Sequence, residues 1–126
     1  MSNITQLQHC EAVQVDHDRL GELYLQLGEH SAEDVVCRAM EEVSMRMTHC
    51  ERYYRKGDMT NLRKSVRSMI AIGEQIGMLA VARVAQDVVV CIDRADPIAL
   101  GATLARLMRA GEGSLSAVWD LQDITV

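Results

Sequence analysis

The sequence predicts an all-α protein, an antiparallel four-helix bundle with a short N-terminal lid helix, on two main observations. The 126 residues include a single proline and are well supplied with Met, Leu, Ala, Glu, Arg and Gln, which favour helix. Apolar residues recur every three or four positions through four long segments, the period of a helix with one buried face. Because this length is usual for one domain, we expect residues 1–126 to form a single unit.

The first predicted helix is short and follows a start, residues 1–15, that we expect to be loosely ordered. Asp16 is a suitable N-cap for this helix, and Gly28 can end it in a left-handed conformation. The apolar residues between these two positions form one stripe, which consists of Leu20, Leu23, Tyr24 and Leu27. We therefore expect the helix to cover one end of the bundle as a lid.

The first two long helices share one apolar spacing. Ser31 with Asp34 is close to a capping box and is expected to begin the first of them. Its apolar positions are Val36, Met40, Val43, Met47, Cys50 and Tyr54. Gly57 is expected to end this helix and Asp58 to cap the next. The apolar positions of that second long helix are Leu62, Val66, Met69, Gly73 and Ile76.

Gly77 separates the second long helix from a third of similar length. The apolar positions of the third helix are Met78, Ala82, Ala85, Val88, Val89 and Ile92. Asp96 and Pro97 then provide an N-cap and a first-turn proline for the last helix. Its inward residues are expected to be Ile98, Leu104, Leu107, Met108, Leu115, Val118 and Trp119, with Gly111 and Gly113 weakening its middle. Such short connections make successive helices antiparallel.

Composition excludes several classes of partner. The chain has 13 basic and 18 acidic residues, a net charge of −5, which argues against nucleic acid or an anionic membrane. Aromatic residues are 3% of the chain and Phe is absent, too few rings for a base-stacking platform. The apolar run 88–92 is far shorter than a membrane span. Scattered cysteines without a CxxC pair, and a start without a basic and apolar leader, favour a cytoplasmic protein with reduced thiols.

The dipeptide His-Cys occurs twice, at His9 and at His49, and helical bundles can hold metals between facing helices. Bundle di-metal sites use Glu-x-x-His pairs, but Arg46 precedes His49 by three residues and Leu27 precedes His30 by three. No Cys or Ser has a His at a spacing that a helix would bring together for nucleophilic catalysis. We therefore expect no metal site, no cofactor and no catalytic residue.

The helix from Asp58 to Ile76 carries the candidate functional face. At 100° per residue, Arg67 points almost directly away from the apolar seam, and both charged and apolar residues surround it. Such a mixed patch suits a protein partner. The alternative is a solvated face with one stray apolar residue. The candidate partner-binding residues are Arg63, Lys64, Arg67, Ile70, Ala71 and Glu74.

Residues 66–78, Val-Arg-Ser-Met-Ile-Ala-Ile-Gly-Glu-Gln-Ile-Gly-Met, resemble the motif of histidine-phosphotransfer (HPt) domains, roughly Ala-His-x-Leu-Lys-Gly-Ser-x-x-x-Leu-Gly-Ala. Residues 20–28 look like that family's first helix, and residues 54–62 resemble the turn that leads into its phosphorylated helix. The resemblance extends from Val15 to Asp123. It implies a bundle fold and a role in two-component signalling, with a response-regulator receiver domain or a histidine kinase as partner.

Three positions depart from the family motif. Arg67 stands where the family has its phosphoacceptor histidine, Ile70 where it has lysine, and Ala71 where it usually has glycine. An imidazole offers a free lone pair near neutral pH, whereas a guanidinium stays protonated and is a poor nucleophile. Because Ala71 remains small, the resemblance implies that a receiver still docks although phosphoryl transfer is lost.

Three functional hypotheses follow. The first is an HPt-like module that binds a receiver domain without carrying phosphate, and so blocks or biases a relay. The second is an active phosphotransferase with another acceptor; His49 is the obvious alternative, but Tyr53 stands at the offset where the family has glycine and would obstruct a receiver. The third is a structural bundle that forms a homodimer through its Met- and Val-rich faces.

Overall fold

A computed structural model describes residues 15–125 of the chain, and these residues form five helices. The helices are α2 (His17–Leu27), α3 (Glu29–Lys56), α4 (Met59–Ile76), α5 (Leu79–Asp93) and α6 (Pro97–Thr125). The predicted all-α class is confirmed. Residues 15–125 form no sheet, and their β pairing is an isolated bridge between Val15 and Met78.

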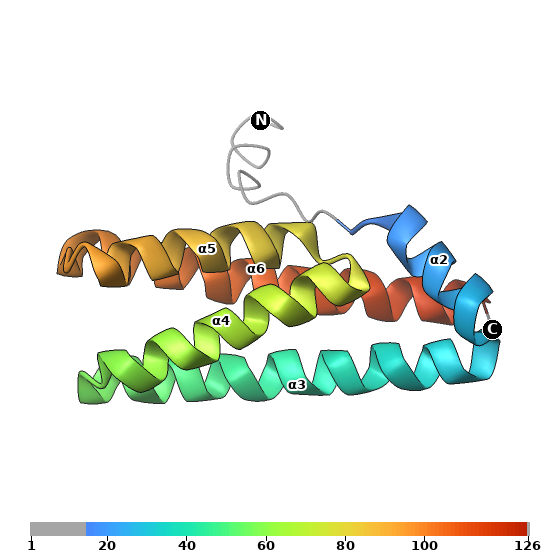
Figure 1. Ribbon diagram of the computed structural model, residues 1–126, viewed down its shortest axis with the longest axis horizontal. Coiled ribbons are helices and arrows are strands. Elements are labelled where there is room, and N and C mark those ends of the chain that lie inside the picture. The colour runs from blue at the N-terminus through green and yellow to red at the C-terminus, as the bar shows by residue number, and fades with distance from the viewer. Residues whose placement is uncertain (1–14, 126) are drawn as a thin grey trace, which may run out of the picture.

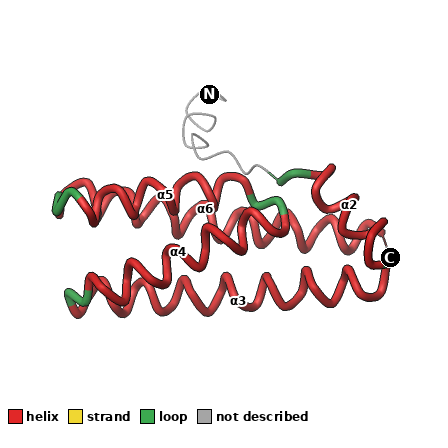
Figure 2. The backbone as a smooth tube through the Cα atoms, in the orientation of Figure 1, coloured by secondary structure: helices red, strands yellow, loops and turns green. Residues whose placement is uncertain are grey.

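The long helices α3 to α6 run lengthwise through the bundle, with α4 inclined to α3, and each runs antiparallel to the next (Figure 1). Tight turns join them (Figure 2). Helix α2 lies at one end of the bundle, beside the start of α3, as expected of a lid. None of the five helices combines the length and the apolar character that a bilayer crossing requires.

Aspartates and glycines set most helix boundaries where the sequence places them. The side chains of Asp16, Asp58 and Asp96 each accept a hydrogen bond from the backbone N–H three residues later, at 3.1 Å. These bonds satisfy donors that a helix start leaves without a partner. Gly57 and Gly77 adopt the left-handed conformation, with φ of 71° and 77°. The predicted caps and stops at these five positions are confirmed.

The predicted start of the first long helix is wrong. Helix α3 begins at Glu29, so Ser31 lies inside its first turn and makes no capping bond. Gly28 serves instead as both the C-cap of α2 and the N-cap of α3, with φ 82° and ψ 161°. Its N–H donates to the carbonyl of Tyr24 and its carbonyl accepts from Ala32. One glycine therefore makes the whole connection, and no side-chain cap is used.

The lid helix is attached to the turn between α4 and α5. The backbone N–H of Asp16 donates to the Gly77 carbonyl at 2.7 Å, and Arg19 Nε donates to the Gln75 carbonyl at 3.0 Å. The bond between Asp16 and Gly77 is part of the antiparallel bridge that pairs Val15 with Met78. Val15 is thus paired, while the other fourteen residues of the segment expected to be loosely ordered lie outside the described residues.

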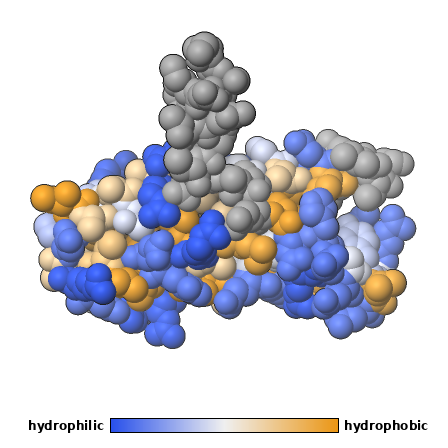
Figure 3. All heavy atoms as spheres, turned by 90° about the horizontal axis from the view of Figure 1, so that it is seen from above, coloured by the Kyte–Doolittle hydropathy of each residue, from blue (hydrophilic) through white to orange (hydrophobic). Residues whose placement is uncertain are grey.

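The core contains the apolar seams of α4 and α5 and most of those of α3 and α6. Tyr54, which the sequence predicts to lie on the α3 seam, is 38% exposed. The largest fully buried side chains are Leu62, Met69, Ile76, Met78, Leu107, Val36, Val43, Val66, Val81, Val84, Val88 and Val118. In α6 the predicted inward positions of Ile98 and Trp119 are wrong, because these side chains are 86% and 57% exposed. Ile98 lies at the end of the bundle where α5 turns into α6, and Figure 3 shows apolar side chains at that end.

Helix α6 continues through Gly111 and Gly113 without a break. A Cβ at Gly111 would lie 2.6 Å from the sulfur of Met47. Here the missing side chain lets α6 approach α3, so this glycine has a packing role in addition to the helix-weakening effect expected of it.

Cys50 is fully buried between α3 and α4, where its thiol donates to the sulfur of Met69 at 4.0 Å. Burial raises the pKa of Cys50 from 9.0 to about 12, with a further increase from Glu51 and an opposing decrease from Arg46. At pH values between these two figures the folded chain keeps a proton that the unfolded chain has lost. The free energy of unfolding must therefore fall as pH rises from about 9 to about 12.

We expect Cys50→Ala to remove this decrease in the free energy of unfolding at alkaline pH. A rise of the pKa from 9.0 to about 12 corresponds to roughly 4 kcal/mol of unfolding free energy across this pH range. The variant should be less stable than the native chain at neutral pH, because alanine leaves a cavity, but its stability should depend less on pH above 9. Urea unfolding at a series of alkaline pH values measures both. Parallel curves for the two proteins would contradict the expectation.

Candidate docking surface on helix α4

The six predicted partner-binding residues all lie on α4, but they differ in exposure. Lys64, Arg67, Ala71 and Glu74 are exposed, whereas Arg63 and Ile70 are half-buried. The opposite side of the helix holds Leu62, Val66 and Met69 in the core. The 3.6-residue period thus places Arg67 on the outward side of α4, as the sequence predicts.

Arg63 forms an ion pair with Asp93 at the end of α5. Its Nε donates to Asp93 Oδ1 at 2.8 Å and its NH2 group donates to Oδ2 at 3.1 Å, so the contact is bidentate. This pairing lowers the pKa of Asp93 and raises the pKa of Arg63. The two side chains are 37% and 52% exposed, so solvent screens the pair and it contributes little to stability. Its main effect is to fix the Arg63 guanidinium against α5.

Arg67 and Lys64 are the positively charged groups of this face that are available to a partner. Within residues 15–125 neither side chain forms a hydrogen bond or a salt bridge. Arg67 lies near enough to Asp93 to contribute to the lowered pKa of that carboxyl group. One carboxylate therefore faces two guanidinium groups, and Lys64 adds a third positive charge. The surface around Arg67 is locally basic although the chain as a whole is acidic.

Ile70 and Ala71 supply a smaller apolar surface than the sequence suggests. The Ile70 side chain is half-buried and packs against the hydrophobic core. Ala71 is exposed and projects little from the helix. A partner would contact a flat, partly apolar surface formed by Ile70 and Ala71 beside the Arg67 guanidinium. Glu74 lies about one helical turn after these two residues. This arrangement suits recognition of an acidic surface by charge-assisted hydrogen bonds.

The described histidines lie on other helices than α4. His49 is half-buried on α3, with its ring centroid 6.1 Å from that of Tyr53, whose ring also lies under the Arg52 guanidinium. His17 is exposed in α2, and His30 is exposed near the start of α3, where it pairs with Asp34 at 3.8 Å. His9 lies outside the described residues. Among residues 15–125, no three His, Cys, Asp or Glu side chains form a group that could hold a metal ion.

Asp93 is the residue of this surface that sequence reasoning missed. It is separated from Arg63 by 30 positions, and no short-range spacing links the two. The useful signal is the similar length of two adjacent antiparallel helices: residues near the start of α4 must lie beside residues near the end of α5. Arg63 and Asp93 satisfy that condition.

Comparisons of the chain with protein-family models, with curated proteins and with solved structures found no match. The resemblance to HPt domains rests on the sequence of residues 20–28, 54–62 and 66–78 and stays a prediction.

Proposed function

We propose that this protein is an HPt-like signalling module that docks the receiver domain of a response regulator through α4 and does not carry a phosphoryl group. The observation that carries the proposal is Arg67. It is exposed on the outward side of α4, without a salt bridge among the described residues, at the position where the resembling motif has its acceptor histidine.

The chemistry of arginine favours binding over transfer. A guanidinium presents several donors in a fixed plane and forms bidentate bonds with carboxylates, but it does not act as a nucleophile. Receiver domains present an acidic pocket, so Arg67 and Lys64 match it in charge. Arg63 contributes to the local field but is already bonded to Asp93. By occupying the pocket, the module would keep a phosphorylating partner away from it.

The other two functions have less support. Phosphoryl transfer through His49 would require a receiver to approach a half-buried ring beside Tyr53. Homodimer formation through valine-rich faces conflicts with the burial of Val81, Val84 and Val88 in the core, although Val90 is exposed. Binding to a histidine kinase through the same face would be a variant of the proposed function, with a different acidic partner.

The test is binding to a panel of receiver domains encoded by the same genome, measured by calorimetry at low ionic strength. We expect Arg67→Glu to weaken binding by about 30-fold or more, because it replaces an attractive charge with a repulsive one. Asp93→Asn should have the opposite effect on receiver affinity and tighten binding several-fold, since it removes the negative charge beside Arg67.

Arg109→Glu is the matched control. It makes the same substitution at an exposed position of α6 and should leave receiver affinity within about twofold of the native value. The proposal fails if no receiver binds the native chain. It also fails if Arg67→Glu and Arg109→Glu have equal effects.

A further inference from the structure

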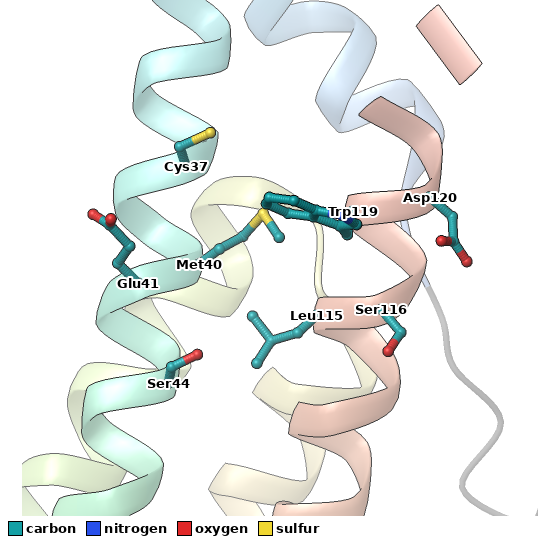
Figure 4. Close-up of a pocket in the computed structure, with 8 residues that line it drawn as sticks. All are labelled: Cys37, Met40, Glu41, Ser44, Leu115, Ser116, Trp119 and Asp120. Carbon is teal, nitrogen blue, oxygen red and sulfur yellow. The ribbon is translucent and has the colours of Figure 1, made fainter. Parts of the chain in front are cut away.

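A groove of about 560 Å³ lies between the first half of α3 and the last part of α6. Figure 4 shows the indole of Trp119 extending from α6 toward α3, next to the sulfur of Met40, with Leu115 also pointing into the space between the helices. Glu41 and Asp120 point outward from the two walls. The groove thus has an apolar floor and a charged rim.

Helix lengths explain why this side of the bundle is open. Helices α3 and α6 have 28 and 29 residues, whereas α4 has 18 and α5 has 15. At a rise of 1.5 Å per residue, the first two exceed the others by roughly 15 Å or more. Met47 fills the space above Gly111, and the groove opens beyond this contact, toward the end of α6. Trp119 remains 57% exposed there.

The charged residues that line the groove are both acidic. Glu41 comes from α3 and Asp120 from α6, so negative charge lies on each wall. The sequence contains no lysine or arginine after Arg109, and Arg38 is the one basic residue between Glu29 and Met45. The electrostatic potential along the groove is therefore negative, in contrast to that of the surface around Arg67.

We propose that the groove binds an amphipathic helix of a partner protein, one with an apolar face and basic flanks. Helix-in-groove recognition uses apolar anchors spaced three or four residues apart. The walls suit such a ligand, because Met40 on α3 and Leu115 and Trp119 on α6 supply apolar side chains for these anchors to contact. Basic flanks would pair with Glu41 and Asp120. The proposal is independent of receiver docking on α4.

Charge also decides between this occupant and two others. In a two-fold dimer through the groove, the acidic rims of both copies would face each other, which is unfavourable. The chain's own residues 1–14 contain no lysine or arginine, so they do not complement the rim either. A basic helix from another protein satisfies both the apolar floor and the acidic walls.

Trp119 is the single tryptophan of the chain, so its fluorescence reports directly on the groove. The probes are two synthetic tryptophan-free helical peptides of about 14 residues, or four turns, with the same leucine face and either lysine or glutamate on the flanks. We expect the lysine peptide to shift Trp119 emission to shorter wavelength and to saturate at one peptide per chain. Its affinity should exceed that of the glutamate peptide at least tenfold.

The double variant Glu41→Lys/Asp120→Lys should reverse the preference between the two peptides. The control Gln26→Lys/Gln86→Lys adds positive charge at exposed positions of α2 and α5 and should keep the native preference. The proposal is overturned if neither peptide shifts the emission, or if the charge reversal changes nothing. Emission that shifts with protein concentration as the chain dimerises would assign the groove to a second copy. If Trp119 emission in the monomer is already blue-shifted and does not respond to either peptide, the groove is occupied by the chain's own residues.

Discussion

Gly73→Ala should lower the free energy of unfolding by about 2 to 3 kcal/mol, although alanine is the better helix former. Gly73 is buried where the end of α4 meets the start of α5. A Cβ at this position would lie 3.0 Å from the Met78 carbonyl oxygen and 3.2 Å from the Ala82 nitrogen. Both are backbone atoms, so neither can move aside by a change of rotamer, and the two helices would have to separate.

Gly21→Ala is the matched control for Gly73. Gly21 is an exposed residue of α2, and nothing lies within 4 Å of its Cβ position. We expect this variant to gain up to about 1 kcal/mol from helix propensity. Gly111→Ala should fall between the two, because the Met47 side chain that it meets is flexible. Urea unfolding followed by circular dichroism measures all three, and equal stabilities for Gly73→Ala and Gly21→Ala would disprove the close contact.

Arg67→His/Ile70→Lys should turn the protein into a phosphoryl acceptor. The double substitution restores the two residue types of the resembling motif whose chemistry is missing. A histidine at position 67 would present its imidazole on the exposed side of α4. A lysine at the half-buried position 70 can place its stem along the apolar floor and its ammonium group in water.

The expected result is acid-labile label on the variant after incubation with a phosphorylated receiver that binds the native chain. The control, Arg67→Gln/Ile70→Lys, has no nucleophile at position 67 and should stay unlabelled under the same conditions. If the histidine variant binds the receiver as tightly as the native chain but takes up no label, the face around position 67 is not aligned with the receiver's phosphorylated residue. The HPt-like mode of docking would then be wrong.

Local signals predicted most helix boundaries correctly. Asp16, Asp58 and Asp96 act as caps because their carboxylates reach the backbone N–H three residues on, and this geometry depends on few neighbours. Ser31 failed as a cap because Gly28 alone connects α2 to α3, which places the serine inside the helix. Local patterns indicate where a cap is favourable, but they do not show which neighbouring residue the chain will use.

The inward positions of α6 failed for a reason that spacing cannot reveal. The spacing of apolar residues shows which of them lie on the same side of a helix. Burial of that side also requires another helix packed against it. Trp119 lies in the part of α6 that extends past α4 and α5, and Ile98 lies at the opposite end of the bundle.

The candidate docking surface was predictable in position but not in electrostatics. Helical periodicity alone placed Arg67 on the outward side of α4. The link between Arg63 and Asp93 joins two helices far apart in the sequence, and it changes which cations are available to a partner. We therefore expect Arg67 and Lys64 to contribute more to the proposed binding than Arg63 does.

Receiver docking without phosphoryl transfer is tested most directly by mixing the native chain with phosphorylated receiver domains and following both the complex and the label. The proposed function predicts a complex in which the phosphoryl group stays on the receiver and no acid-labile label appears on this chain. Label on the native chain, abolished by a single His→Gln substitution, would contradict it and establish an active phosphotransferase.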